Sequence, residues 1–209
     1  METEKIPDIV IGRLPRYLQA LQRMQLENHL TTNSKELGER LGISAAQIRK
    51  DLSQFGEFGK QGTGYSVPFL IKTLQSILKV TSVWDVVLVG AGDLGHALAR
   101  YQGFSNRGFR IAMIFDNDPQ VIGNQIGHFV VQDMASLVEK VLDANIHVAM
   151  LTVPASSAQK VAENLIKAGV KAILSYAPIT LNLPPGIHVE YIDPILKLQH
   201  MTYYLDGTN

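Results

Sequence analysis

Apolar residues follow two different periodicities along the chain, one before residue 80 and one after it. In the first stretch they recur every three or four positions, as they do in amphipathic helices. After Trp84, short apolar runs alternate with helical segments, which is typical of a parallel sheet covered by helices. We therefore expect an α/β chain with a helical domain at 1–80, a parallel-sheet domain at 81–192 and a C-terminal helix at 193–209.

Two helices joined by a tight turn are expected within residues 33–54. Asn33 and Ser44 each stand three residues before a Glu or a Gln, which is the pattern of a capping box at a helix start. Gly42 supplies the turn between the two helices. This spacing predicts a helix-turn-helix, whose second helix enters the major groove of DNA. A first amphipathic helix precedes the pair and carries four apolar residues at helical spacing, Leu14, Leu18, Leu21 and Met24.

The second helix of this pair, together with the hairpin expected after it, carries side chains suited to DNA. Arg and Lys engage phosphates or guanine, and Gln suits adenine. Residues 58–65 are rich in glycine and predict a basic hairpin, the wing of a winged helix. Residues 1–80 hold 11 Lys and Arg against 8 Asp and Glu, which is compatible with a polyanionic partner. The predicted DNA contacts are Ser44, Gln47, Arg49, Lys50, Ser53, Lys60, Gly62 and Tyr65.

A glycine motif opens the second domain. Val86–Val89 predicts a buried strand, and the sequence Gly90-Ala91-Gly92-Asp93-Leu94-Gly95 follows it at the start of a helix. This is the G-x-G-x-x-G pattern of a dinucleotide-binding Rossmann turn. Its first glycine permits the turn, its second admits the pyrophosphate, and its third allows close helix–strand packing. The six residues from Gly90 to Gly95 are therefore predicted to bind the cofactor in a doubly wound parallel sheet.

The cofactor is expected to be NADH or NAD+. A second predicted strand ends in Asp116, where a carboxylate accepts hydrogen bonds from ribose hydroxyls and repels a 2′-phosphate. A third strand ends in Thr152-Val153-Pro154. Because strand C-termini face the ligand crevice of such a sheet, we expect these three residues to lie near the nicotinamide end of the site.

The remaining features favour a regulator over an enzyme. The second domain accounts for about one dinucleotide-binding domain, so no substrate domain remains. The six His residues are scattered, and no spacing suggests metal or hydride chemistry. With no Cys, no signal-like start and no apolar run long enough to cross a bilayer, we expect a cytoplasmic protein without a metal or a membrane partner. Two alternatives stay open: a small NAD-dependent oxidoreductase, and a CoA- or nucleotide-binding module of a larger enzyme.

The C-terminal segment is expected to form an apolar helix. Residues 194–205 carry apolar side chains on nearly every face, so the helix must be buried. Its cover is either its own domain or a partner subunit. A dimer would suit DNA binding, because paired recognition helices read pseudo-palindromic sites.

Taken together, these motifs resemble the Rex family of redox-sensing transcriptional repressors, and the resemblance runs almost from end to end. The joining of a recognition helix and wing to a Rossmann turn makes it specific. The residues that carry it are Arg13-Leu14-Pro15-x-Tyr17, Gln47-Ile48-Arg49-Lys50-Asp51-Leu52-Ser53-x-Phe55-Gly56-x-Phe58-Gly59, Gly62-x-Gly64-Tyr65, Gly90-x-Gly92-x-x-Gly95, Phe115-Asp116, Leu151-Thr152-Val153-Pro154 and Ala177-Pro178.

The resemblance implies a homodimer with an N-terminal winged helix, a C-terminal NAD(H) domain and a terminal helix exchanged between subunits. It implies repression at pseudo-palindromic operator DNA that is relieved when NADH rises. On this pattern Arg49 and Lys50 contact DNA, and Tyr101 and Asp193 relay the ligand state between subunits. The chain departs from the family pattern at Gln19, where Arg is usual, at His128, where Gly is usual, and at Ser175, where Asn is usual.

Overall fold

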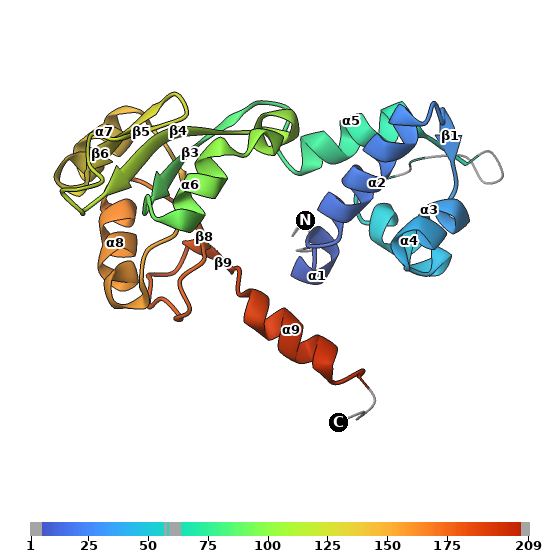
Figure 1. The fold of residues 1–209 in the computed structure, drawn as a ribbon. Coiled ribbons are helices and arrows are strands. Elements are labelled where there is room, and N and C mark those ends of the chain that lie inside the picture. Colours follow the sequence, from blue (N-terminus) through green and yellow to red (C-terminus); the bar gives the residue numbers. More distant parts are fainter. Residues whose placement is uncertain (1–5, 57, 59–63, 206–209) are drawn as a thin grey trace. The chain divides into compact units, whose positions relative to one another are not determined.

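A computed structural model describes residues 6–56, 58 and 64–205, and the chain separates into two compact units, Met1–Ser82 and Val83–Asn209 (Figure 1). The first unit consists of α1 (Asp8–Ile11), α2 (Leu14–Leu26), β1 (Thr31–Thr32), α3 (Ser34–Leu41), α4 (Ala45–Ser53), β2 (Tyr65–Ser66) and α5 (Val67–Ile77). The second consists of β3 (Trp84–Val89), α6 (Asp93–Arg100), η1 (Gln102–Arg107), β4 (Phe109–Asp116), β5 (Gln125–Ile126), β6 (Phe129–Asp133), η2 (Met134–Ser136), α7 (Leu137–Asp143), β7 (Val148–Leu151), α8 (Ala155–Lys167), β8 (Ala172–Ser175), β9 (His188–Tyr191) and α9 (Pro194–Thr202).

The first unit has its own apolar core, built from the helices that the periodicity predicted. Leu14, Leu21 and Met24 on α2 are fully buried, and Leu37 of α3 and Leu70 of α5 pack into the same cluster. Burying a side chain of this size contributes about 1.5–3 kcal/mol relative to leaving it exposed. This cluster therefore supplies the main force that holds α2, α3, α4 and α5 together.

A buried carboxylate lies inside this core. The side chain of Asp51, on α4, is inaccessible to solvent and receives donors from two helices. Arg13 donates through Nε to Oδ2 at 2.6 Å and through Nη2 to Oδ1 at 2.7 Å. Tyr17 donates its hydroxyl to Oδ2 at 2.6 Å, and Gln47 donates Nε2 to Oδ1 at 2.7 Å. The carboxylate therefore joins the start of α2 to the middle of α4.

These contacts determine the charge states of the cluster. Burial alone would raise the pKa of Asp51, but the hydrogen bonds from Arg13, Tyr17 and Gln47 outweigh it and lower that pKa. The pKa of Tyr17 is raised to about 12, first by burial and then by the neighbouring Asp51 carboxylate. At neutral pH the cluster therefore contains an ionised Asp51 and a neutral Tyr17.

A short antiparallel ladder, which the sequence pattern did not indicate, closes the first unit. Thr32 of β1 pairs with Tyr65 of β2, and Thr31 pairs with Ser66. The hairpin expected at residues 58–65 falls largely on residues outside the described part of the chain, so the wing stays a prediction.

The second unit is a doubly wound sheet, as predicted. Its strand order is β5-β6-β4-β3-β7-β8-β9, and every pairing is parallel except that of β5 with β6. The chain moves outward from β3 through β4 to β6 and then returns to β7 on the other side of β3. The C-terminal ends of β3 and β7 therefore meet at the point where the winding reverses, which is where ligands bind in such sheets.

Two apolar layers cover the faces of this sheet. On one face Val87 and Val89 pack with residues of α7 and α8, among them Val141 and Ala162. On the other face Leu88 lies in a cluster that includes residues of α6 and η1. Figure 1 shows α6 on one side of the sheet and α7 and α8 on the other. Because both faces are covered, the strands consist of nearly continuous apolar runs.

The C-terminal helix α9 has no buried residue. Ile195, Leu196, Leu198 and Met201 are each more than half exposed. Of the two covers considered for this helix, its own domain supplies none among the described residues. Apolar side chains on this scale require a cover, because their exposure to water is unfavourable.

Removing the Tyr17 hydroxyl tests the buried cluster. Tyr17 holds its proton up to about pH 12 in the folded chain but loses it near pH 10 in the unfolded one. Its stabilising effect is thus complete below pH 10 and disappears as the pH rises toward 12; a shift of this size corresponds to roughly 3 kcal/mol.

We expect Tyr17→Phe to lower the free energy of unfolding at pH 8, and we expect the difference in that free energy from wild type to close between pH 10 and 12. Urea unfolding followed by circular dichroism measures this, with the exposed Tyr203→Phe as control. A gap that stays constant from pH 8 to 12 would contradict the assigned role of the hydroxyl.

Candidate DNA-binding and dinucleotide-binding sites

The helix-turn-helix predicted from the sequence is present in the first unit. The side chain of Asn33 accepts hydrogen bonds from the backbone N–H groups of Lys35 and Glu36, both at 3.0 Å, and so begins α3. Gly42 ends α3 in the left-handed conformation (φ 67°), which a glycine adopts at little cost. Ser44 then begins α4 by accepting from the N–H of Gln47 at 3.2 Å.

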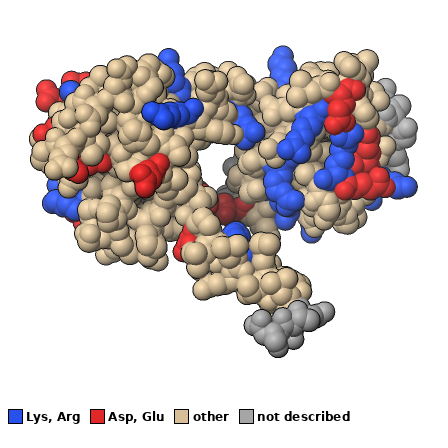
Figure 2. Space-filling view, viewed as in Figure 1, with Lys and Arg blue, Asp and Glu red and all other residues tan. Residues whose placement is uncertain are grey.

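The outward face of α4 is basic and polar. Arg49, Lys50 and Ser53 are exposed. Arg49 donates through Nη1 to the hydroxyl of Ser34 at 3.0 Å, which steadies its guanidinium beside the start of α3. On the face that Figure 2 shows, this unit carries both basic and acidic side chains rather than charges of one sign. The local arrangement on α4, and not the bulk charge, is therefore the feature that suits DNA.

The other predicted DNA contacts differ in how far the structure describes them. Tyr65 lies in β2 and is half-buried. Lys60 and Gly62 lie outside the described residues. Gln47 does not project freely from α4, because its amide is hydrogen-bonded to Asp51. The sequence reasoning missed Asp51, although a signal was present: it stands three residues after the buried Ile48, at an inward position of α4.

The glycine turn of the second unit follows β3 as predicted. Gly90 has φ 101°, and a Cβ atom there would collide with the backbone of Thr152. A Cβ on Gly95 would collide with the carbonyl group of Gly90. The hydroxyl of Thr152 donates toward the carbonyl oxygens of Gly90 at 2.8 Å and Val89 at 3.0 Å. The first and third glycines thus let β3, α6 and the end of β7 approach one another closely.

The second glycine of the motif faces open space. A Cβ on Gly92 would meet no atom within 4 Å. Gly92 is the N-cap of α6, and no side chain caps this helix. The first backbone N–H groups of a helix have no intrahelical acceptor, and the helix dipole favours negative charge there. The turn therefore fits an anionic group such as a pyrophosphate.

Asp116 lies beside this turn at the end of β4. Its Oδ2 accepts from the N–H of Ala91 at 2.6 Å, and its Oδ1 accepts from the N–H groups of Asn117 at 2.7 Å and Asp118 at 2.9 Å. The predicted acid and the glycine turn are therefore in direct contact. A ribose next to a pyrophosphate on the turn would meet this carboxylate, so the residues present fit a dinucleotide.

The remaining predicted residues lie around this edge of the sheet. Thr152 and Val153 follow β7 and are half-buried, and Pro154 is exposed at the start of α8. Ser175 ends β8; its hydroxyl is buried and, in the described part of the chain, has no hydrogen-bond partner. Two cavities lie elsewhere: one of about 460 Å³ runs along β4 and β6, and one of about 570 Å³ is lined by residues of α6, η1 and β4. The exposed His128 contributes to both.

The two predicted relay residues lie at separate places in the second unit. Tyr101 is half exposed, and its ring meets that of Phe104 edge to face, with 5.1 Å between centroids. Asp193 is the N-cap of α9 and accepts from the N–H of Ile195 at 2.9 Å. Among the described residues, no hydrogen bond joins these two side chains, so their relay role stays a prediction.

In the first unit, Gln19 is exposed and lines a cavity of about 220 Å³ with Arg16, Arg23 and Arg40.

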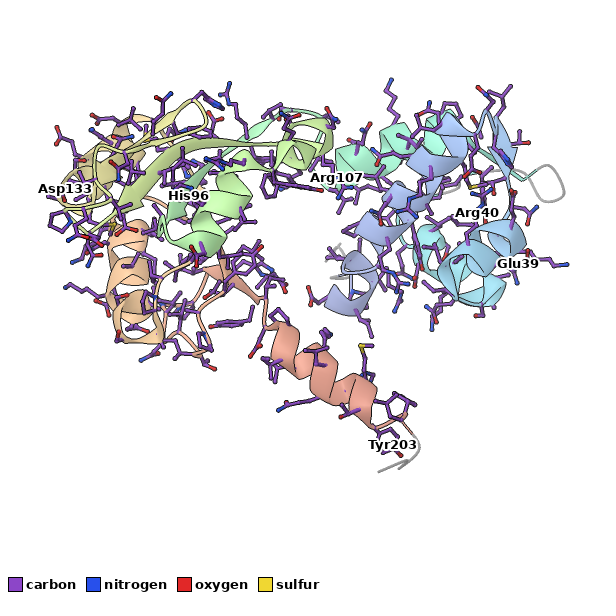
Figure 3. The ribbon with its side chains drawn as sticks, viewed as in Figure 1. Glu39, Arg40, His96, Arg107, Asp133 and Tyr203 are labelled. Atoms are coloured by element: carbon purple, nitrogen blue, oxygen red, sulfur yellow. The ribbon has the colours of Figure 1, made fainter. Side chains whose placement is uncertain are left out.

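Histidines and carboxylates do not gather into a reactive group in the part of the chain that the structure describes. His96 projects from α6, and Asp133 lies apart from it at the end of β6 (Figure 3). His147 contacts the carbonyl oxygen of Gly169 through Nδ1 at 3.0 Å. Within residues 6–56, 58 and 64–205, no cluster of three His, Cys, Asp or Glu is placed to hold a metal ion. Over the same residues, no helix is both long and apolar enough to cross a bilayer.

Comparison with known families divides the chain as the two sites do. Residues 5–53 match the family model described as "Putative DNA-binding protein N-terminus". Residues 81–179 match the model described as "CoA binding domain". The first match contains α2, α3 and α4, and the second contains the glycine turn and Asp116.

Curated relatives cover nearly the whole chain. A redox-sensing transcriptional repressor Rex from Chloroflexus aggregans is 50% identical over 203 residues, which are 97% of this chain and 96% of the relative. A Rex repressor from Brevibacillus brevis is 42% identical over 97% of this chain and 98% of its own. These relatives are named as repressors and not as enzymes.

Solved structures agree with the curated relatives. The structure of RSP in complex with β-NAD+ and operator DNA has a TM-score of 0.91 and 35% identity, and it covers 96% of this chain and 92% of that one. RSP in complex with β-NADH has a TM-score of 0.87 and 33% identity, with 96% and 94% covered. RSP is described as a Rex-family repressor. By sequence and by fold, over nearly its whole length, this chain belongs to the Rex family of redox-sensing transcriptional repressors.

Proposed function

We propose that this chain represses transcription by binding operator DNA as a homodimer through α4, and that NADH bound in the second unit releases it. One observation carries the proposal: a single chain joins a helix-turn-helix with exposed Arg49 and Lys50 to an uncapped glycine turn in contact with Asp116. The RSP structures support both halves, since one contains β-NAD+ with operator DNA and another contains β-NADH.

The side chains of α4 and its N-cap make two kinds of contact with DNA. Arg49 and Lys50 supply positive charge to phosphates or to guanine edges, and Ser44 and Ser53 supply small polar groups. Tyr65, Lys60 and Gly62 would add contacts from the wing.

On the dinucleotide side, Gly90, Gly92 and Gly95 shape the turn, and the N–H groups at the start of α6 receive the pyrophosphate. Ala91, Asp93 and Leu94 belong to the same turn, and Asp116 accepts from a ribose hydroxyl. Bound NADH supplies the redox signal and reacts with nothing, so the chain needs no catalytic residue.

The preference for NADH over NAD+ has a physical basis in charge. The nicotinamide ring of NAD+ is positively charged, and that of NADH is not. Val153 and Pro154 after β7, and Pro178 after β8, offer apolar surface at the edge where the ring would lie. An apolar surface penalises an unpaired charge, so it favours the neutral ring.

The dimer provides the cover that α9 lacks. A second copy is its proposed occupant, because paired recognition helices bind pseudo-palindromic DNA and the exposed apolar residues of α9 need a partner. In this assembly Tyr101 and Asp193 relay the ligand state between subunits, and residues 193–209 act as a separate dimerisation element. The protein works in the cytoplasm, where its DNA and its dinucleotide are both present.

A binding titration tests the function as a whole. Fluorescence anisotropy on pooled bacterial promoter DNA, at one salt concentration, is measured without ligand and with NADH, NAD+ or CoA. We expect NADH to weaken DNA binding, NAD+ to leave it intact and CoA to have no effect. Because coupling is reciprocal, DNA must weaken NADH binding by the same factor.

Two other outcomes would contradict this expectation. Release of DNA by CoA instead of NADH would support the nucleotide-binding alternative suggested by the family model of residues 81–179. DNA binding that no ligand changes would disprove the redox switch.

Replacing Arg49 tests the DNA site. We expect Arg49→Ala to weaken DNA binding by roughly 5- to 150-fold, because one direct contact is lost, and to leave NADH affinity unchanged. Anisotropy and NADH titration measure the two affinities. Arg107→Ala, an exposed arginine of the second unit, serves as control. Equal loss of both affinities in the Arg49 variant would show a folding defect and not a lost contact.

Replacing Asp116 tests the dinucleotide site. We expect Asp116→Ala to weaken NADH binding by about tenfold or more and to reduce discrimination against NADPH, since a hydrogen-bond acceptor and a negative charge are both removed. Isothermal titration with the two dinucleotides measures this, and Asp143→Ala provides an exposed acidic control in the same unit. Wild-type affinity for both ligands would exclude the ribose role.

A further inference from the structure

The carboxylate of Asp51 is saturated with donors. Oδ2 accepts from Nε of Arg13 and from the hydroxyl of Tyr17, both at 2.6 Å. Oδ1 accepts from Nη2 of Arg13 and from Nε2 of Gln47, both at 2.7 Å. An ionised carboxylate offers about four lone-pair sites, so these four bonds use its full capacity. The group is inaccessible to water, which leaves no other donor to replace one that departs.

The contact with Asp51 removes an ambiguity in the side chain of Gln47. A glutamine amide has a donor end, Nε2, and an acceptor end, Oε1, and it can present either one after a simple flip. An ionised carboxylate accepts hydrogen bonds and cannot donate them. The amide must therefore turn Nε2 toward Asp51. In the described part of the chain Oε1 of Gln47 accepts no hydrogen bond, so the acceptor end is the free one.

Gln47 stands where such an orientation affects DNA recognition. It is the third residue of α4, and residues at the start of a recognition helix contact base edges in the major groove. It is half-buried, so part of its amide reaches the surface. A free Oε1 accepts from the amino group of adenine or cytosine, whereas guanine and thymine present acceptors at the corresponding positions.

We propose that Asp51 is a positioning residue for base selection: by holding Nε2 of Gln47, it leaves Oε1 to the DNA and makes α4 favour adenine or cytosine at the contacted position. Arg13, the N-cap of α2, and Tyr17 on α2 hold Asp51 in turn, so the order of dependence runs from the start of α2 through Asp51 to Gln47. This inference rests on the proposed DNA-binding function.

The test is a base-preference profile. Full-length protein selects duplexes from a pool with a randomised core, and the selected duplex is then changed one base pair at a time in competition binding at one salt concentration. For wild type we expect one position in each half-site to favour adenine or cytosine over guanine by roughly 5- to 150-fold. We expect Gln47→Ala to lose the preference at that position alone, because Asp51 keeps its bonds to Arg13 and Tyr17. Gln25→Ala, an exposed glutamine on α2, should keep the wild-type profile.

Asp51→Asn gives the sharper result. With its oxygen in the place of Oδ2, held by Nε of Arg13 and the hydroxyl of Tyr17, the new amide turns its NH2 group toward Gln47, which must then present Nε2 to the DNA. Nη2 of Arg13 loses its acceptor, so an overall loss of affinity is expected as well. We expect the preference at that one position to decrease or reverse toward guanine, whatever the overall loss of affinity. A change confined to one base position is something that a merely structural residue would not produce.

Three results would count against the proposal, and they are distinguishable. If Gln47→Ala keeps the wild-type profile, Gln47 does not select a base. If Asp51→Asn lowers affinity evenly at all positions, Asp51 is structural and the inference is wrong. If wild type selects no duplex at all, the proposed function fails, and the base-selecting role fails with it.

A second measurement covers the case in which Asp51→Asn does not fold. The Gln47→Ala profile is then combined with the NMR resonances of the Gln47 side-chain amide in the wild-type protein. Side-chain Nε2 protons protected from exchange in the absence of DNA support the hold by Asp51, and freely exchanging ones overturn it.

Discussion

Within the apolar core of the first unit, and at the edge of the sheet in the second, one carboxylate is supplied with several hydrogen-bond donors. A buried or half-buried carboxylate without partners is costly, so the chain segments that provide its partners have to converge on it. Asp51 collects donors from α2 and α4 in the first unit. Asp116 collects backbone N–H groups from the glycine turn and from its own loop in the second. Both sites are thereby positioned by the same requirement.

The two carboxylates meet this requirement in different ways. Arg13 is 38 residues away from Asp51, so its pairing joins two helices and depends on the assembled core. Asp116 takes two of its three bonds from the residues immediately after it, so it is ordered largely by its own turn. The first arrangement stabilises tertiary structure, and the second orders a short local segment beside the glycine turn.

Local signals in the sequence predicted most of the fold. The capping residues Asn33 and Ser44 act as their spacing indicated, and Gly90 and Gly95 take up the backbone positions that the motif requires. The two-residue strand β1 gave no signal, because periodicity needs more than two residues to be seen. Asp51 was missed because its partners are defined by packing across the core. The apolar pattern of α9 predicts burial, and the described part of the chain supplies no surface that covers this helix.

On the proposed ribose role, the ordering of Asp116 has a consequence for the free energy of ligand binding. Oδ1 already accepts two hydrogen bonds and Oδ2 accepts one, so one lone-pair site on Oδ2 is left for an incoming hydroxyl. The rotamer of the side chain is set before any ligand arrives. The conformational entropy of the Asp116 side chain is lost during folding, so ligand binding does not reduce it further. On the proposed ribose role, such a preorganised acceptor raises the affinity for the ligand without adding a contact.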